Sequence, residues 1–488
     1  MSPSIARVLT GTFASVLAAG CTLTPPPQTP EVVLEVSDLD RFNGADAATP
    51  EIASLEAWWR QIGGKALDAW VGVLRRDSLS LHEARLRAVQ AREQERLMRS
   101  DSRPAVSVTG GATTSRSLGP DGRFSWSDGY SAGLDASFDV DVFGRLRTSE
   151  RAAAYSAAAA ELSYRAAEQR EIAALTRNWI SAATLQRRLD LAMANADSFR
   201  TTFELTDQRY RAGSPSVSAS DVQIARQNFD TALIDIPNLA AQLGIQLMVI
   251  DEQLGRLPGE SAPEFSGTLL SMTSLNILVG QPAELLANRP DVAAAELAYL
   301  AALEDVGAAR ASFYPALSLS AGLTFQEDTP EDLFDWDRHI ARLAASLAQP
   351  VFTGGRLEAR LRLEQAQAEE LAAAYGRTTL AAVVDVEIAL ENLNGLTGQK
   401  ARLEAAVASA RLSNELVQNR YRQGLVSILA VLETQRSLNA AEQNLILTEQ
   451  TLANAQVDLF LSLGGDWTGV AAPSAEASAA STTRTSGD

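Results

Sequence analysis

The sequence has little of the residues on which catalysis, metal binding and disulfide bonding depend. Its 488 residues contain one cysteine, Cys21, and two histidines, His82 and His339. A single thiol forms no internal disulfide, and two distant histidines without a second cysteine give no pattern for a metal site or a histidine-dependent triad. Gly354-Gly355 is not followed by the Lys-Ser/Thr pair of a phosphate loop. We therefore expect no enzymatic activity, no cofactor and no metal.

Basic residues are also scarce relative to acidic ones. The chain has 42 Lys and Arg against 60 Asp and Glu, a formal net charge of −18. This balance argues against nucleic acid as a partner, because phosphates must be neutralised by basic side chains. It is compatible with a pore that favours cations.

Long hydrophobic runs are missing as well. Beyond residue 20 no run of 18 or more apolar residues occurs, so we expect no transmembrane helix. Residues 1–20 resemble a secretory signal peptide, with Arg7 as the only charge and small residues before the cleavage point.

The residue after this segment is Cys21. Leu17-Ala18-Ala19-Gly20-Cys21 resembles a bacterial lipobox, although Ala18 stands where Leu is usual. The resemblance implies that Cys21 is lipidated, with palmitate among its acyl chains. Thr22 in place of Asp implies release to the outer membrane. The alternative is an ordinary signal peptide followed by a chance cysteine.

What the sequence does contain is a repeat at an offset of 211 residues. The matches are Pro104 with Pro315, Gly144-Arg145 with Gly355-Arg356, and Arg209-Tyr210-Arg211 plus Gly213 with Arg420-Tyr421-Arg422 plus Gly424. We divide the chain into a signal peptide (1–20), a lipid-anchored extended tether (21–50), a first repeat (51–260), a second repeat (261–468) and a disordered tail (469–488). Each repeat is predicted to contain a helix, two strands and two long helices.

Apolar and polar residues alternate without interruption from Tyr130 to Val142, within a strand predicted from Trp126 to Phe143. Such a length favours a transmembrane barrel strand over a strand of a soluble sandwich. Three carboxylates, Asp135, Asp139 and Asp141, fall on the polar face and are predicted to line the barrel lumen. Shorter alternating segments occur at 106–114, 317–325 and 342–351.

Four strands cannot close a barrel in lipid, because the open edges would leave backbone groups unpaired. Three copies of the chain would supply twelve strands, enough for a barrel with an aqueous lumen. We therefore expect a homotrimer.

No glycine or proline occurs between Gly144 and Gly213, so about 68 residues could form one helix of roughly 100 Å. Apolar residues recur at steps of four and three from Leu185 to Tyr210, and Val431, Leu438, Leu445, Leu452 and Leu459 follow every seven residues. These spacings predict coiled-coil packing. The helices taken alone are equally compatible with a soluble helical bundle.

Two blocks of residues resemble the TolC-like outer membrane factors, nearest to their NodT-type efflux lipoprotein branch. The blocks include Arg289-Pro290-Asp291-Val292, Phe313-Tyr314-Pro315, Gly424-Leu425-Val426-Ser427 and Leu463-Gly464-Gly465-Asp466-Trp467, with Trp58-Trp59 near the start. The resemblance implies an α+β membrane protein: a trimeric outer membrane β-barrel that continues into a long α-helical coiled-coil tunnel in the periplasm. It also implies an efflux duct that serves an inner membrane resistance-nodulation-division (RND) pump through a periplasmic adaptor, or membrane fusion, protein.

The same resemblance assigns roles to the ends of the helical hairpins. Residues 209–218 and 420–428 would form tips that constrict the tunnel and dock the adaptor; the residues concerned are Tyr210, Arg211, Gly213 and Gly424. Tyr421 and Arg422 would hold the closed tip, and Glu433 would form a ring of carboxylates. A second acidic position of the family is occupied by Ala430. The alternatives are that Tyr421 simply packs and that Glu433 is an ordinary solvated residue.

Rival functions remain open from the sequence. One is a periplasmic scaffold lipoprotein made of coiled coils, which the long alternating strand opposes. Another is a lipid-anchored surface enzyme, which the lack of catalytic motifs opposes. Within the channel class, the alternative is the outer membrane duct of a type I protein secretion system or of a heavy-metal export system.

Overall fold

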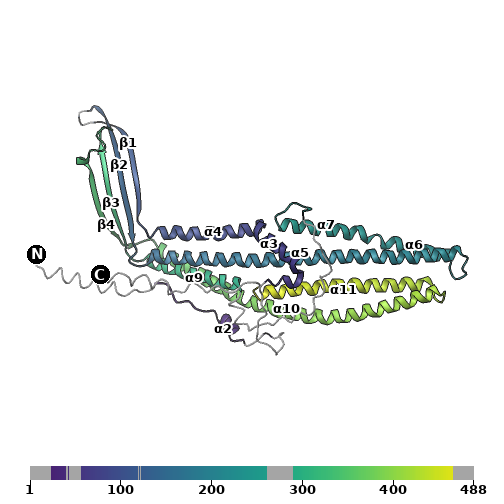
Figure 1. Cartoon of the computed structure of the whole chain (residues 1–488). Coiled ribbons are helices and arrows are strands. Elements are labelled where there is room, and N and C mark those ends of the chain that lie inside the picture. The colour runs from purple at the N-terminus through teal and green to yellow at the C-terminus, as the bar shows by residue number, and fades with distance from the viewer. Residues whose placement is uncertain are drawn as a thin grey trace, which may run out of the picture. The chain divides into compact units, whose positions relative to one another are not determined.

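The computed structural model describes residues 23–39, 42, 57–118, 120, 122–260 and 289–464. The signal peptide, Cys21 and the tail lie outside these residues. Figure 1 shows the elements in chain order: α2 (Glu31–Ser37), α3 (Arg60–Asp77), α4 (Leu79–Ser100), β1 (Ala105–Leu118), β2 (Phe124–Val140), α5 (Arg145–Arg211), α6 (Ala219–Ala232), α7 (Asp235–Gln253), α9 (Pro290–Ala311), β3 (Ala316–Glu327), a 3₁₀ turn η1 (Trp336–Arg338), β4 (Ile340–Ala348), α10 (Arg356–Arg422) and α11 (Ile428–Ser462).

The chain divides into two compact units. The strand unit comprises Met1–Pro30, Arg87–Glu161 and Ala294–Gly376, and the hairpin unit comprises Glu31–Leu86, Leu162–Ala293 and Arg377–Asp488. The strand unit therefore holds the sheet and most of α9. The hairpin unit holds α3, α6, α7, α11 and the larger parts of α5 and α10.

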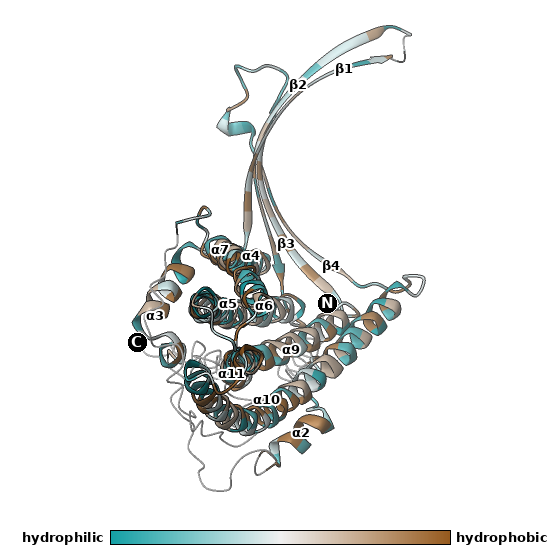
Figure 2. Ribbon diagram, turned by 90° about the vertical axis from the view of Figure 1, so that its right-hand side faces the viewer, coloured by the Kyte–Doolittle hydropathy of each residue, from teal (hydrophilic) through white to brown (hydrophobic). Residues whose placement is uncertain are grey.

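The four strands form one antiparallel sheet in the order β1-β2-β3-β4, which is curved (Figure 2). The strand predicted from Trp126 to Phe143 is present as β2 and begins and ends two to three residues earlier. The register places Asp135 opposite Ser107 of β1 and opposite Gly322 of β3. Opposite residues share a face, so the polar positions of all four strands lie on one face and the apolar positions on the other.

Helices α5 and α10 have the same length and correspond to each other in the two predicted repeats. Each contains 67 residues, and the bounds Arg145–Arg211 shifted by 211 become Arg356–Arg422. Gly144 and Gly355, which precede them, both have positive φ, at 77° and 82°. Glycine adopts this conformation without steric cost, so the same local signal begins both helices.

The second long helix of the first repeat is broken, contrary to the prediction. α6 ends at Ala232 and α7 begins at Asp235, two residues before Pro237. Proline lacks an N–H and clashes with the carbonyl of the residue four positions earlier, which here is Leu233. The equivalent helix of the second repeat, α11, is continuous over 35 residues.

Among the described residues, the segment Ala219–Gln253, which comprises α6 and α7, is long and apolar enough to be considered as a membrane span; the expectation of no transmembrane helix stays a prediction. This segment is 35 residues long with a window of mean hydropathy 1.5, of which 11% is buried. Length and composition are the only grounds for considering it a span.

A short helix corrects another expectation, that residues 21–50 are extended. α2 follows Pro30 and buries Val33 and Val36. Their spacing of three places both side chains on one face of a helix, which gives the segment an apolar side to bury.

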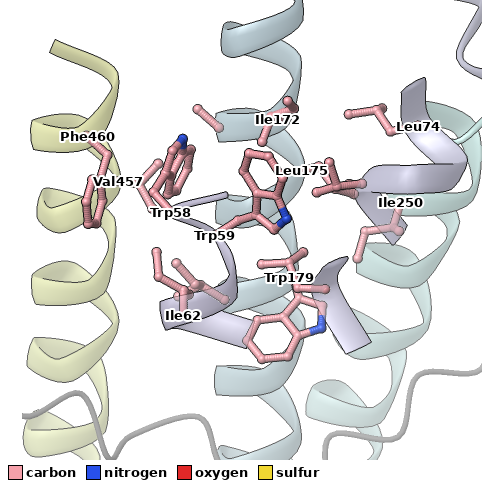
Figure 3. Close-up of a cluster of buried hydrophobic side chains, with 14 of the residues drawn as sticks. Trp58, Trp59, Ile62, Leu74, Ile172, Leu175, Trp179, Ile250, Val457 and Phe460 are labelled. Atoms are coloured by element: carbon pink, nitrogen blue, oxygen red, sulfur yellow. The ribbon is translucent and has the colours of Figure 1, made fainter. Parts of the chain in front are cut away.

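The largest apolar cluster lies in the hairpin unit and joins α3, α5, α7 and α11 (Figure 3). Trp58 is fully buried and stacks on Phe460 with ring centroids 5.2 Å apart. Trp59 lies edge-on to Trp58 and donates its indole N–H to Asp68 at 2.9 Å. Large aromatic side chains dominate such a core, so the residues that precede α3 are packed against α11 through Trp58 and Phe460.

Candidate functional site

Each long helix ends in the turn that its glycine predicts. Gly213 and Gly424 have φ values of 73° and 78°. After α5, the N–H of Ser214 donates to the carbonyl of Arg209; after α10, the N–H of Leu425 donates to the carbonyl of Arg420. This is the left-handed C-terminal cap that glycine favours, and it reverses the chain at both hairpin tips.

At the first tip, helix α6 begins with a capping box that the sequence analysis did not predict. The Ser218 hydroxyl accepts from the N–H of Asp221, and the Asp221 carboxylate accepts from the N–H of Ser218. The Ser-x-x-Asp spacing before α6 is a recognisable signal for a helix start. It satisfies two backbone donors at the first tip.

Tyr421 lies at the centre of the apolar cluster that joins the two tips. Its side chain is 4% exposed, and it packs with residues of α5, α6 and α11, namely Phe199, Ala225, Ile428, Val431 and Leu432. Its hydroxyl lies 2.9 Å from the hydroxyl of Thr206. Within one chain Tyr421 therefore both packs and forms a hydrogen bond, and its role in holding the closed tip stays a prediction.

Arg209 is the second partner of Tyr421, and the sequence did not single it out. Its guanidinium donates to the Tyr421 carbonyl at 2.7 Å and lies 5.0 Å from the centre of the Tyr421 ring. Arg422, which we predicted to hold the tip, donates instead to Asn419 of its own helix at 2.9 Å. A contribution of Arg422 to closure remains a prediction.

The tyrosine of the first repeat has different surroundings. Tyr210 is 45% exposed, whereas its counterpart Tyr421 is buried. Arg211 forms an ion pair with Asp207 one turn earlier at 2.8 Å. The first tip thus presents an aromatic and a charged side chain to solvent, as a docking surface requires.

Glu433 lies near the start of α11 and faces solvent. Its side chain is 75% exposed, and its carboxylate is 3.6 Å from Arg436. The contribution of Glu433 to a ring of carboxylates stays a prediction. Ala430 lies one turn earlier and carries no charge.

The polar face of the sheet carries Asp135 and Asp139, as predicted. Asp135 accepts a hydrogen bond from Thr109 at 3.2 Å, and Asp139 lies opposite Ser318. Arg342 of β4 lies on the same face, opposite Gly322. The polar face therefore also carries a positive charge, which the sequence analysis did not predict.

Asp141 has a role that we did not predict. It lies one residue beyond the end of β2, and its carboxylate accepts from the N–H groups of Leu146 and Arg147 at 3.1 and 2.9 Å. A carboxylate at the start of a helix satisfies free N–H groups and interacts favourably with the helix dipole. Asp141 therefore caps α5.

Among the residues that the structure describes, no group of three or more His, Cys, Asp or Glu side chains could hold a metal ion. His339 lies against Trp336, with its Nδ1 2.6 Å from the Trp336 carbonyl oxygen.

The comparisons with known proteins agree with this architecture. Residues 70–256 and 282–465 match the family described as outer membrane efflux protein. The pyoverdine export outer membrane protein OpmQ of Pseudomonas aeruginosa is 29% identical over 472 residues, covering 93% of this chain and 96% of the relative. The cation efflux system protein CusC of Escherichia coli K12 is 26% identical over 453 residues, covering 91% and 96%.

Solved structures share the fold. The outer membrane channel OprN has a TM-score of 0.82 at 26% identity, covering 92% of this chain and 100% of that one. The open state of the Neisseria gonorrhoeae MtrE outer membrane channel has a TM-score of 0.81 at 24% identity, covering 91% and 98%. With more than half of its residues matched by the family, the chain belongs to the outer membrane efflux proteins.

Proposed function

We propose that the chain is the outer membrane exit duct of a tripartite efflux system and passively conducts small molecules to the cell exterior. The observation that carries this proposal is the sheet. It has one apolar and one polar face, and β1 and β4 lie at its two edges. A transmembrane barrel needs this pattern of faces and needs its edges paired.

Closure of the barrel by three copies follows from the strand number. With four strands per chain, a homotrimer supplies twelve, and β4 of one copy would pair with β1 of the next. The apolar face, with Val108, Leu343 and Leu347 highly exposed in a single chain, would face lipid. Asp135 and Asp139 would face the lumen, together with Arg342. The two repeats and the equal lengths of α5 and α10 support a helical tunnel that continues from the barrel into the periplasm.

The hairpin tips would form the periplasmic entrance. Tyr421 joins the two tips of one chain, and Glu433 would contribute one ring of carboxylates around the trimer axis. Exposed Tyr210 and Arg211 would contact a periplasmic adaptor, which would connect the duct to an inner membrane RND-type pump. The pump rather than the duct would select the cargo, because a wide duct discriminates little between small molecules.

The alternative, a duct for type I protein secretion or for heavy-metal export, is less favoured. Relatives include proteins named for pyoverdine export and for toluene efflux, and these cargoes are small molecules. CusC is named for cation efflux, so the identity of the partner pump would distinguish a metal cargo from an organic one.

We also propose that Cys21 anchors the protein to the outer membrane by a lipid. Support comes from the lipobox-like residues 17–21 and from the family, whose members are outer membrane proteins.

Native mass spectrometry of protein extracted in detergent from the outer membrane tests the whole proposal. We expect a trimer with lipid mass on each chain. A monomer or dimer would mean that the strands do not close a barrel in this way, and it would contradict the proposed duct. A trimer without lipid mass would contradict the proposed lipid anchor but would still support the proposed duct.

A further inference from the structure

Few residues on the polar face of the sheet carry a charge. The register places every second residue of the four strands on this face, and most of these residues are serine, threonine, glycine or alanine. Among the described strand positions on this face, the charged ones are Asp135, Asp139 and Arg342. These side chains therefore determine the charge of the polar face.

Asp135 and Arg342 lie in one row across the sheet. Asp135 of β2 is opposite Gly322 of β3, and Gly322 is opposite Arg342 of β4. Neighbouring strands are about 4.8 Å apart, so two strand spacings separate the backbones of Asp135 and Arg342 by about 10 Å. Two side chains of opposite charge thus face the same space at this separation.

Gly322 leaves the space between the two charges open. A Cβ added at Gly322 would lie 3.1 Å from Oδ1 of Asp135, so this carboxylate oxygen lies beside the glycine. The other oxygen, Oδ2, accepts a hydrogen bond from the Thr109 hydroxyl at 3.2 Å. The carboxylate is therefore held on the β1 side, and no side chain at position 322 separates it from Arg342.

Arg342 carries a charge that no carboxylate neutralises. Its side chain is exposed, and among the described residues it forms no ion pair. Asp139 is also exposed, and it lies opposite Ser318, four residues further along β2 than Asp135. Exposed charges without partners act on the ions in the surrounding water, so both signs of charge are available to ions that pass this face.

We infer that Asp135 and Arg342 form a charge-selective row in the lumen of the barrel, and that Arg342 limits the preference for cations that the two aspartates produce. In the trimer proposed above, the row is present three times, so carboxylates and guanidinium groups alternate around the lumen. Charged side chains that line a pore select ions by the sign of their charge.

The expected size of the effect follows from the charge of each chain. Two carboxylates and one guanidinium on the polar face give a net charge of −1 per chain, which becomes −2 when Arg342 is replaced by a neutral residue. Arg342 is then a residue that determines specificity for the sign of charge. This inference rests on the proposed duct, and it leaves the choice among neutral molecules to the pump.

A reporter thiol on the polar face tests the row. Ser320→Cys, introduced into the full chain in outer membranes, places a thiol on the exposed polar face of β3, opposite Ser137 and Ala344. We measure how fast a cationic and an anionic methanethiosulfonate reagent modify the peptide that contains position 320. Arg342→Ser should lower the ratio of the anionic to the cationic rate about threefold at low ionic strength, and Asp135→Asn should raise this ratio.

Two control variants separate charge from structure. Arg342→Lys keeps the positive charge and should leave the ratio as in the wild type. Arg116→Ser removes one positive charge from the other face of the sheet, where Arg116 lies opposite Trp126, and should also leave the ratio unchanged. A ratio that does not respond to Arg342→Ser, or that responds equally to Arg116→Ser, would overturn the inference.

Reversal potentials of the purified trimer in planar bilayers test the consequence for conduction. Under a KCl gradient, Arg342→Ser should shift the reversal potential towards the K⁺ equilibrium potential, and Asp135→Asn should shift it the other way. Both shifts should shrink near 1 M salt, where the screening length is about 3 Å. Reversal potentials that match the wild type would overturn the inference.

The two proposals can fail separately. If a conducting trimer forms and its rate ratio and reversal potential do not respond to Arg342→Ser, the duct is supported and the charge-selective row is contradicted. If the protein is not a trimer, the duct is contradicted, and the row in its lumen is contradicted with it.

Discussion

The guanidinium of Arg209, near the end of α5, donates a 2.7 Å hydrogen bond to the carbonyl oxygen of Tyr421, near the end of α10. The bond joins the two hairpin tips of one chain through residues 212 positions apart. The same carbonyl accepts from the N–H of Gly424 at 2.9 Å, and Arg209 adds a second, charged donor to it. The tips are therefore linked within each chain before any contact between chains is considered.

Removing this donor should loosen the tip. We expect Arg209→Ala to raise the conductance of the purified trimer in planar bilayers, because a hydrogen bond with a charged group contributes about 1.5–3 kcal/mol. Arg211→Ala is the control, since its ion pair with Asp207 is local and exposed, and such pairs contribute little. Equal conductance changes in the two variants would contradict a specific role for Arg209.

A smaller effect is expected from Tyr421→Phe. It removes one hydroxyl from the pair with Thr206, but Thr206 keeps a bond to the Thr202 carbonyl at 2.7 Å. We expect a loss of about 1 kcal/mol in tip stability and a conductance between those of the wild type and Arg209→Ala. Tyr210→Phe, at the exposed counterpart, should behave as wild type. If Tyr210→Phe changed the conductance as much as Tyr421→Phe does, the burial of Tyr421 would not explain its contribution to tip stability.

Glu433→Ala tests the proposed ring of carboxylates. We expect a higher resting conductance and a weaker block by multivalent cations, because three gathered carboxylates attract cations more than one does. Glu415→Ala removes one charge from α10 and serves as the control. Conductance and block that match the wild type would place Glu433 among ordinary solvated residues.

The stability of the strand unit should depend on pH through Asp305. Partial removal from water, with the nearby charge of Glu364, raises the pKa of Asp305 to about 6 from its ordinary 3.8; Arg360 opposes this and Glu304 adds to it. Between pH 3.8 and about 6 the folded state then binds more protons than the unfolded state, so stability falls as the pH rises.

Asp305→Asn should remove this fall. The variant should unfold at a higher temperature than the wild type above pH 6 and at a similar temperature near pH 4, as followed by circular dichroism. Asp328→Asn, which removes a carboxylate after β3, is the control. A constant difference between Asp305→Asn and the wild type at all pH values would contradict a titration at this site.

Lipidation is tested directly by Cys21→Ser. Because the thiol is the attachment atom, the substitution should abolish labelling of the protein with palmitate in cells. A variant with Thr22→Ser keeps the thiol and should label normally. Labelling that persists in Cys21→Ser would exclude Cys21 as the acceptor.

Strict periodicity made the strands and the long helices predictable from the sequence. The alternation from Tyr130 to Val142 located β2 within a few residues, and the glycines at 144, 213, 355 and 424 marked both ends of α5 and α10. Pro237 could have predicted the break between α6 and α7. The break was missed because the apolar pattern on both sides of Pro237 is compatible with one continuous helix.

The partners at the tip could not be predicted in the same way. Arg420, Tyr421 and Arg422 are adjacent in sequence, and each residue turns about 100° around the helix, so only the packing decides which side chain meets the other hairpin. Arg209 belongs to a different helix, and no local sequence pattern predicts its contact with Tyr421. The capping role of Asp141 was missed for a related reason, because the alternation of β2 continues past the point where the strand ends; its place in the lumen stays a prediction.

The two long helices differ in compliance. α5 contains no glycine, whereas α10 contains Gly376, Gly395 and Gly398, each of which weakens a helix by roughly 0.5–1 kcal/mol relative to alanine. A Cβ added at Gly395 or Gly398 would meet nothing within 4 Å, so packing among the described residues does not require glycine there. Any bending that widens the tunnel should therefore concentrate in α10, while α5 stays straighter. The bend would lie in α10, the helix whose Tyr421 carbonyl accepts the hydrogen bond from Arg209.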